Sequence, residues 1–289
     1  MAISRKDNDR KQISAAPLSL KNERRKLTMV LLAAIAVTNA FLLVAPTPEL
    51  RSISGNLSAP ITAGAAMVLG ALVVREQGIK GLFGRAYVAL AVGITLWTIA
   101  EVIWAYNAIA LDIAVPFPSI ADALWLVGYI PFAYYMFTTS SAVYGVHPRK
   151  KATFIVSLAV AAFSGLYMAS LLSASQLTGP DAAQAITITI LYPVLDSIIV
   201  VPAVLSLLNS GHGELTSIPW IFISWILTVV ADGIFGYTIV TNTSESLQLL
   251  PDLIYNCAYL FMAAGIYWHY RYFVASNKKL DEIWRKAHA

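Results

Sequence analysis

"LTMVLLAAIAVTNAFLLVAP", residues 27–46, carries no charged side chain and is long enough for a helix to cross the hydrocarbon core of a bilayer. Similar runs recur to the end of the chain, and the charged residues lie in short clusters between them. Overall, 58% of residues are hydrophobic and 12% are charged, whereas about a quarter are charged in soluble domains. The sequence therefore predicts an all-α integral membrane protein in contact with the lipid bilayer.

We predict eight transmembrane helices, separated by segments rich in Gly, Pro and basic residues. Their expected limits are 27–46, 58–75, 86–111, 119–144, 152–175, 184–209, 217–241 and 249–273. The chain then divides into a basic tail (1–26), a first four-helix unit (27–144), a second four-helix unit (152–273) and an interfacial tail (274–289).

All Lys and Arg residues except Arg51 fall on one predicted side of the membrane. Because positive charge concentrates on the cytoplasmic side, both termini are expected in the cytoplasm and the protein in the cytoplasmic membrane. The net charge of +4 is then explained by an anionic leaflet, and we expect no nucleic acid partner. Asn56 and Asn242 each begin an N-glycosylation triplet in a loop predicted to lie outside.

The two halves of the chain correspond after a shift of about 130 residues. The segment "AEVIWAY" (100–106) aligns with "ADGIFGY" (231–237), which pairs Glu101 with Asp232. A one-residue gap then pairs Asp122 with Asp252. These matches predict a 4+4 parallel internal repeat about an axis along the membrane normal, although low complexity is an alternative explanation.

Five carboxylates fall within predicted spans, and no Lys or Arg lies deep in any span. An ionised acid in a bilayer is costly, so these side chains should face the bundle interior or water. Each can be neutral, hydrogen-bonded or bound to a cation. Most lie in the predicted outer half, so we expect any cavity that they line to open outward.

Aromatic residues flank the acids at helical spacing: Trp97 and Trp104 lie on the same helix face as Glu101. An acidic, aromatic-lined cavity suits a small cationic or hydrogen-bonding ligand. The predicted ligand or ion site consists of Glu101, Asp196, Asp232, Trp97, Trp104 and Tyr192, supported by Asp122, Asp252, Tyr129 and Tyr259. A structural alternative is that Asp122 and Asp252 stabilise helix N-termini.

The sequence gives little support for catalysis, metal binding or a bound cofactor. The histidines lie in predicted cytoplasmic segments or, for His269, near the inner end of the last span. We predict no catalytic residue, metal site or cofactor, and no intramembrane Lys could form a retinal Schiff base. The lone cysteine, Cys257, is expected to serve in packing.

The segment "AEVIWAYNAIALDIAVPFPSIADALWLVGY" (100–129), followed by "YPVLDSI" (192–198), resembles the multispan membrane region upstream of diguanylate cyclase (GGDEF) or histidine kinase domains. This resemblance implies a membrane sensor. The chain ends soon after the last span, so we expect no attached output domain and a separate protein partner for the signal. A shorter segment, "ADGIFGY" with "LLPDLIYNCAYLFMAAG" (249–265), is similar to the lysoplasmalogenase family, which implies hydrolysis of a lysolipid.

Our leading hypothesis is therefore a non-enzymatic, multi-pass sensor or ligand-binding module. The alternatives are a proton- or cation-coupled carrier of a small solute, an intramembrane lipid hydrolase and a subunit of a larger membrane complex. Broken half-helices at matched positions of the two halves would favour the carrier.

Overall fold

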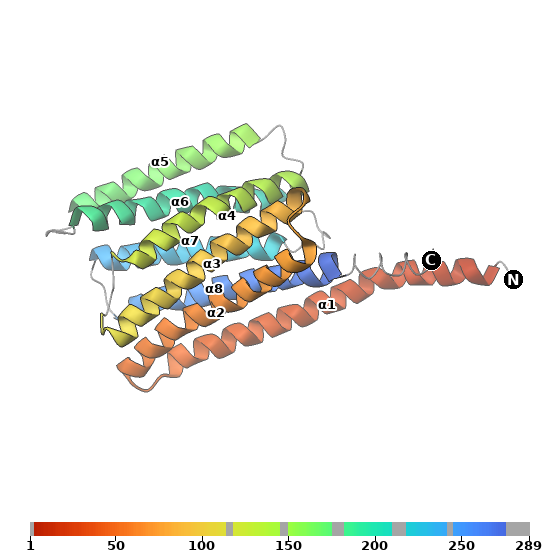
Figure 1. The fold of residues 1–289 in the computed structure, drawn as a ribbon, viewed down its shortest axis with the longest axis horizontal. Helices are drawn as coiled ribbons and strands as arrows, with labels where there is room; N and C mark the ends of the chain where they lie inside the picture. Colours follow the sequence, from red (N-terminus) through yellow and green to blue (C-terminus); the bar gives the residue numbers. More distant parts are fainter. Residues whose placement is uncertain are drawn as a thin grey trace.

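The computed structural model of the chain describes residues 3–113, 118–144, 150–174, 182–209, 218–241 and 245–275. Long helices make up almost all of these residues and run side by side as one bundle (Figure 1). In chain order they are α1 (Ile3–Val44), α2 (Pro48–Gln77), α3 (Gly81–Ala110), α4 (Ile120–Tyr144), α5 (Lys150–Ala174), α6 (Ala182–Asn209), α7 (Ile218–Thr241) and α8 (Glu245–His269), followed by the π-helical turn η1 (Tyr270–Val274).

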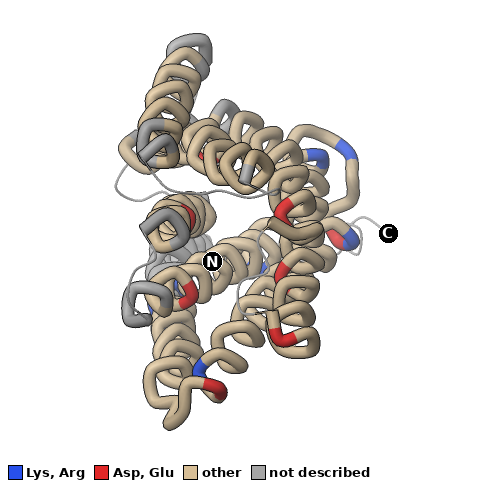
Figure 2. Tube along the Cα trace, turned by 90° about the vertical axis from the view of Figure 1, so that its left-hand side faces the viewer, with Lys and Arg blue, Asp and Glu red and all other residues tan. Residues whose placement is uncertain are grey.

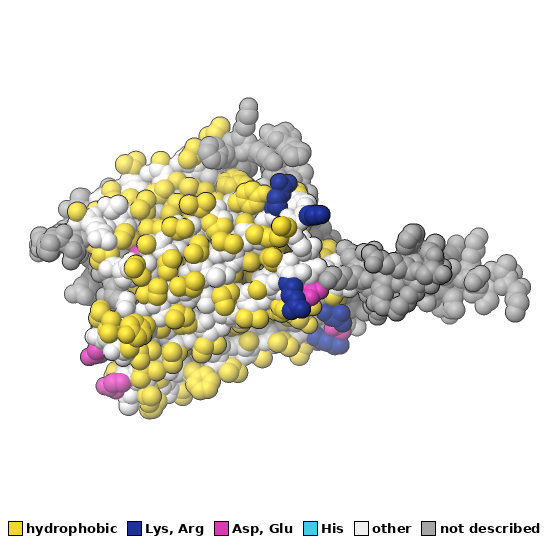
Figure 3. All heavy atoms as spheres, viewed as in Figure 1, with side chains coloured by type: hydrophobic (Ala, Val, Ile, Leu, Met, Phe, Trp, Pro, Cys, Tyr) yellow, Lys and Arg dark blue, Asp and Glu magenta, His cyan; other side chains and the backbone are white. Residues whose placement is uncertain are grey.

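Seven of these helices are long and apolar enough to cross a membrane, which confirms a multi-pass membrane protein. The exception is α5, in which the apolar stretch covers only Ile155–Ala169 within the described residues. Apolar side chains cover the flank of the bundle visible in Figure 3, and Lys and Arg gather at one end. Such a flank is suited to contact with lipid.

Six helices form a closed ring in which each packs against the next, in the order α2, α3, α4, α6, α7, α8 and back to α2. Helices α1 and α5 lie outside this ring. Helix α1 packs beside α8 and α2, whereas α5 packs beside α6. Figure 1 accordingly places α1 and α5 on opposite sides of the bundle.

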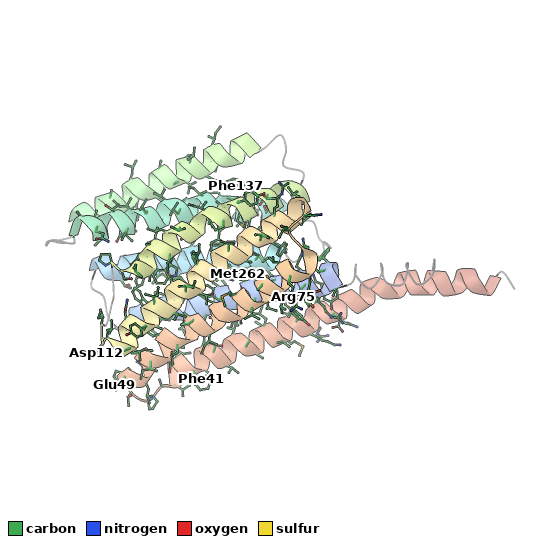
Figure 4. All side chains as sticks on the ribbon, viewed as in Figure 1. Phe41, Glu49, Arg75, Asp112, Phe137 and Met262 are labelled. Atoms are coloured by element: carbon green, nitrogen blue, oxygen red, sulfur yellow. The ribbon has the colours of Figure 1, made fainter. Side chains whose placement is uncertain are left out.

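The two ends of the bundle differ in charge. Arg75 lies at the end where α1 begins and η1 ends, whereas Glu49 and Asp112 lie at the opposite end (Figure 4). We call the first the basic end and the second the acidic end. Figure 2 looks along the bundle from the acidic end and shows Asp and Glu positions on several helices.

Helix α2 begins ten residues before the predicted span, at Pro48, because Thr47 caps it. The Thr47 hydroxyl accepts a hydrogen bond from the Leu50 amide at 3.2 Å. Asn56 is therefore a helical residue, and the expectation that it lies in a loop is wrong. Asn242 lies outside the described residues.

Helix α8 also begins early, at Glu245, which places Asp252 about two turns inside the helix. The prediction that Asp252 stabilises a helix start is therefore wrong. Asp122 does lie in the first turn of α4, and its Oδ2 accepts a 2.7 Å hydrogen bond from the Ser119 amide. For Asp122 the helix-start interpretation is confirmed.

Tight packing of aromatic side chains fills the middle of the ring. The Phe132 and Trp225 rings are fully buried and lie edge to face, with centroids 4.6 Å apart. Trp97 packs against both of these rings. The Phe132 ring approaches Gly93 so closely that a Cβ there would lie 2.6 Å from it. This aromatic layer supports the site described next.

Candidate functional site

A cavity of about 110 Å³ lies inside the ring, towards the acidic end. It is bordered by Gly55 near the start of α2, Trp104 near the end of α3 and Asp122 at the start of α4. Residues of α5, α6, α7 and α8 complete its wall. The cavity thus joins parts of the chain from position 55 to position 259.

All ten residues that the sequence analysis selected line this one cavity. They are Glu101, Asp196, Asp232, Trp97, Trp104 and Tyr192, together with Asp122, Asp252, Tyr129 and Tyr259. The five intramembrane acids thus converge, each from a different helix: α3, α4, α6, α7 and α8.

Tyrosine hydroxyls donate to most of these acids. The Tyr259 hydroxyl donates a 2.6 Å hydrogen bond to Glu101 Oε1, which joins α8 to α3. The Tyr192 hydroxyl donates to Asp122 Oδ1 at 3.0 Å, which joins α6 to α4. Since an unpaired buried carboxyl is costly, these bonds help the acids to lie inside the membrane.

Asp196 and Asp232 share one hydroxyl. The Tyr129 oxygen lies 2.5 Å from Asp196 Oδ1 and 3.2 Å from Asp232 Oδ2. Tyr255, from α8, also hydrogen-bonds Asp232 through its hydroxyl. The two carboxyl groups therefore form a linked pair that connects α4, α6, α7 and α8.

Asp252 differs from the other four acids. Among the described residues, its carboxylate takes part in no hydrogen bond or ion pair. Its Oδ2 faces α2, only 2.8 Å from the position that a Cβ on Gly55 would occupy. The Asp252 carboxylate therefore fits against α2 because Gly55 has no side chain.

The cavity wall is acidic and aromatic. No Lys or Arg lines it within the part of the chain that the structure describes. Trp104 lies near Trp125 and Phe235, with ring centroids 5.6 and 6.0 Å away. The Trp97 indole N–H donates to the backbone carbonyl of Trp125 at 2.9 Å, so it is not free for a ligand.

Further lining residues were not among the predicted site residues. Trp125 and Tyr255 each follow an acid by three residues, and the helical spacing that selected Trp104 marks them in the sequence as well. Asn56 was placed in a loop, and Met168 lies in a stretch of α5 that has no acid nearby. In these two cases only the packing of the helices brings the side chain to the cavity.

A metal site finds no geometric support among the described residues, where no three His, Cys, Asp or Glu side chains group closely enough to hold an ion. His269 lies far from the acids, near the basic end, where its Nε2 is 2.7 Å from Gln77 Oε1. Cys257 is half-buried, with its sulfur 3.4 Å from the Asn39 amide nitrogen.

Comparison with known proteins identifies no relative: no family model, no curated protein and no solved structure matches the chain.

Proposed function

We propose that this membrane protein is a ligand-binding sensor module that holds a small cation in the acidic, aromatic-lined cavity. One observation carries the proposal: five carboxyl groups from five helices line one cavity, and no Lys or Arg of the described residues lines it with them. Charged groups inside a membrane protein are costly without a partner. A bound cation would supply the missing positive charge.

The aromatic rings add a second source of affinity for a cation. Trp104, Trp125 and Phe235 form one wall close to the acids. Aromatic faces attract ammonium groups by about 0.5–2 kcal/mol, more strongly where water is excluded. An amine is therefore favoured over a bare metal ion, since no three His, Cys, Asp or Glu side chains of the described residues group closely enough to hold an ion.

The charge pattern supports an orientation with the cavity outside. The cavity lies towards the acidic end, and Arg75 marks the basic end. Positive charge favours the cytoplasmic side, so we infer that both termini are cytoplasmic and that the cavity faces outward. A ligand there would draw together helices from both halves of the chain, and a separate protein would read that change at the cytoplasmic side.

Three relationships support the inferred duplication. Helix α2 packs against α8, and the matching pair, α6 and α4, also packs together. The Tyr259–Glu101 hydrogen bond has its counterpart in Tyr129–Asp232. Finally, α1 and α5, which would be equivalent, both lie outside the ring.

The test is binding of a panel of amines, from methylamine to dodecylamine, to the purified protein in nanodiscs. Binding is measured as a rise in the thermal unfolding midpoint. We expect at least one amine to stabilise the wild type, and Glu101→Gln and Asp232→Asn to remove that stabilisation while membrane insertion is retained.

The matched control is Asp112→Asn. Asp112 lies at the same end of the bundle but does not line the cavity, and its φ of 55° is one that Asn also adopts. This variant should respond to amines as the wild type does. Equal amine responses in all three variants, or no response of the wild type to any amine, would reject the proposal.

The carrier hypothesis lacks the feature expected to favour it. Helices α2 and α6 continue through Pro60 and Pro193 without interruption, so neither is a pair of half-helices. A carrier of the broken-helix type is therefore disfavoured.

A lipid hydrolase is the second candidate, favoured by the Asp196–Asp232 pair. Two carboxyl groups linked by one tyrosine hydroxyl are suited to divide the roles of general acid and general base. The test is incubation of the purified protein with vinyl-ether lysolipids, with Asp196→Asn as the comparison. Product release by the wild type alone would establish this function.

A further inference from the structure

Gly233 gives the cavity an opening in its side wall. This residue of α7 lines the cavity and is also solvent-exposed. A Cβ placed on Gly233 would meet no atom of the described residues within 4 Å. No side chain at this position therefore separates the cavity from the outer face of α7.

The exposed side of α7 at Gly233 is the side that contacts lipid. Val230 and Tyr237, three residues before and four after, share its face and are 46% and 48% exposed. Gly233 lies eight residues from Thr241, the last residue of α7, which is about 12 Å along the helix. The opening thus faces the bilayer and not the water beyond the helix end.

Met168 of α5 forms the other edge of this opening. Although α5 lies outside the ring, Met168 is buried and lines the cavity. Its Cε is 3.6 Å from the position that a Cβ on Gly236 would take. Helix α5 is held against α6 by a 3.1 Å hydrogen bond between Ser164 and Ser197.

The equivalent position of the first half, within the residues that the structure describes, is closed by a side chain. In the alignment of "AEVIWAY" with "ADGIFGY", Val102 corresponds to Gly233 and Ala105 to Gly236. Val102 carries a side chain, is exposed, and does not line the cavity. The opening is therefore a difference between two otherwise similar halves.

We propose that the ligand of this cavity is an amphiphilic amine that enters from the bilayer between Gly233 and Met168. Its ammonium group lies among the carboxylates, and its hydrocarbon chain leaves through the lateral opening into lipid. Apolar edges at the opening and acids behind it match the two parts of such a molecule. This inference rests on the proposed cation site.

The test compares dodecylamine with propylamine, which differ only in the length of the chain. In Gly233→Leu the new side chain occupies the space of the hydrocarbon chain. We expect dodecylamine affinity to fall at least about tenfold and propylamine affinity to stay unchanged, because only the longer ligand meets the added bulk.

The matched control is Gly64→Leu. Gly64 lies inside α2, also has open space around its Cβ position, and does not line the cavity. Affinity for both amines should be unaffected there. Unchanged dodecylamine affinity in Gly233→Leu, or an equal loss for both amines, would overturn the lateral route while leaving the cation site standing.

A second measurement covers the case in which Gly233→Leu does not fold. In a Cys257→Ser background and at alkaline pH, where part of the thiol ionises, Gly233→Cys should react with a lipid-soluble maleimide and resist a membrane-impermeant one. Dodecylamine should protect this thiol, whereas propylamine should not. Labelling by the impermeant reagent, or no protection by dodecylamine, would contradict the route. If no amine binds the wild type at all, the cation site itself fails.

Discussion

Tyr259 on α8 donates a 2.6 Å hydrogen bond to Glu101 on α3, two residues that lie 158 positions apart in the chain. Tyr129 and Asp232, which would correspond to them if the two halves are a repeat, are joined by a hydrogen bond of 3.2 Å. Each tyrosine reaches from one half of the chain to an acid of the other. These two bonds connect the halves across the cavity.

Tyr259→Phe should destabilise the protein by about 1–2 kcal/mol, because Glu101 then loses its hydroxyl donor inside the membrane. Reversible unfolding in mixed detergent measures the loss. Tyr106→Phe is the control, since Tyr106 is 59% exposed and should change stability by less than about 0.5 kcal/mol. Equal effects of the two substitutions would show that the Glu101 contact contributes nothing.

Gly128→Ala should destabilise the fold by about 1–3 kcal/mol through overpacking. A Cβ at this position would lie 2.5 Å from the Trp97 indole, so the ring would have to leave the Trp125 carbonyl. Gly64→Ala meets no close atom of the described residues and should be neutral or stabilising by up to about 1 kcal/mol. The thermal unfolding midpoint should fall in Gly128→Ala and stay the same or rise in Gly64→Ala. Equal midpoints in the two variants would contradict the close contact between Gly128 and Trp97.

Asn256→Ala should loosen the attachment of α1. The fully buried Asn256 amide donates to Asn39 Oδ1 on α1 at 3.2 Å and to Ser58 Oγ on α2 at 3.0 Å. We expect a loss of about 1–2 kcal/mol in detergent unfolding and faster proteolysis of α1. Thr187→Ala, on an exposed face of α6, serves as the control and should leave α1 protected.

Labelling of single cysteines should reveal the orientation in the membrane. In intact cells that produce the Cys257→Ser protein, Asp112→Cys should react with a membrane-impermeant maleimide and Lys80→Cys should not. Both positions are exposed, but Lys80 lies between α2 and α3 at the basic end, whereas Asp112 lies at the acidic end. The reverse labelling pattern would place the cavity on the cytoplasmic side.

The sequence by itself determined the class of fold and the positions of most helices. Bilayer-spanning runs such as 27–46 are a local property, because hydrophobicity and length alone decide whether a helix can lie in lipid. The acids of the site were also visible locally. Without a basic partner in their spans, residues such as Glu101 and Asp232 have to face the protein interior.

Helix ends were harder to predict, because capping and packing decide them. Thr47 begins α2 well before its most apolar stretch, so Asn56 lies on a helix. Asp122 and Asp252 stand in similar sequence contexts, yet only Asp122 accepts a hydrogen bond at a helix start. Hydrophobicity alone does not distinguish these two acids.

Only the tertiary structure decided how the acids meet. Tyr259 donates a hydrogen bond to Glu101, and the Tyr129 hydroxyl lies within hydrogen-bond distance of both Asp196 and Asp232. These contacts depend on the order of six helices in a ring. The lateral route that we propose at Gly233 depends in the same way on where α5 packs. Such contacts join residues far apart in the chain, and a helical period specifies the face of one helix but not the neighbour that the face will meet.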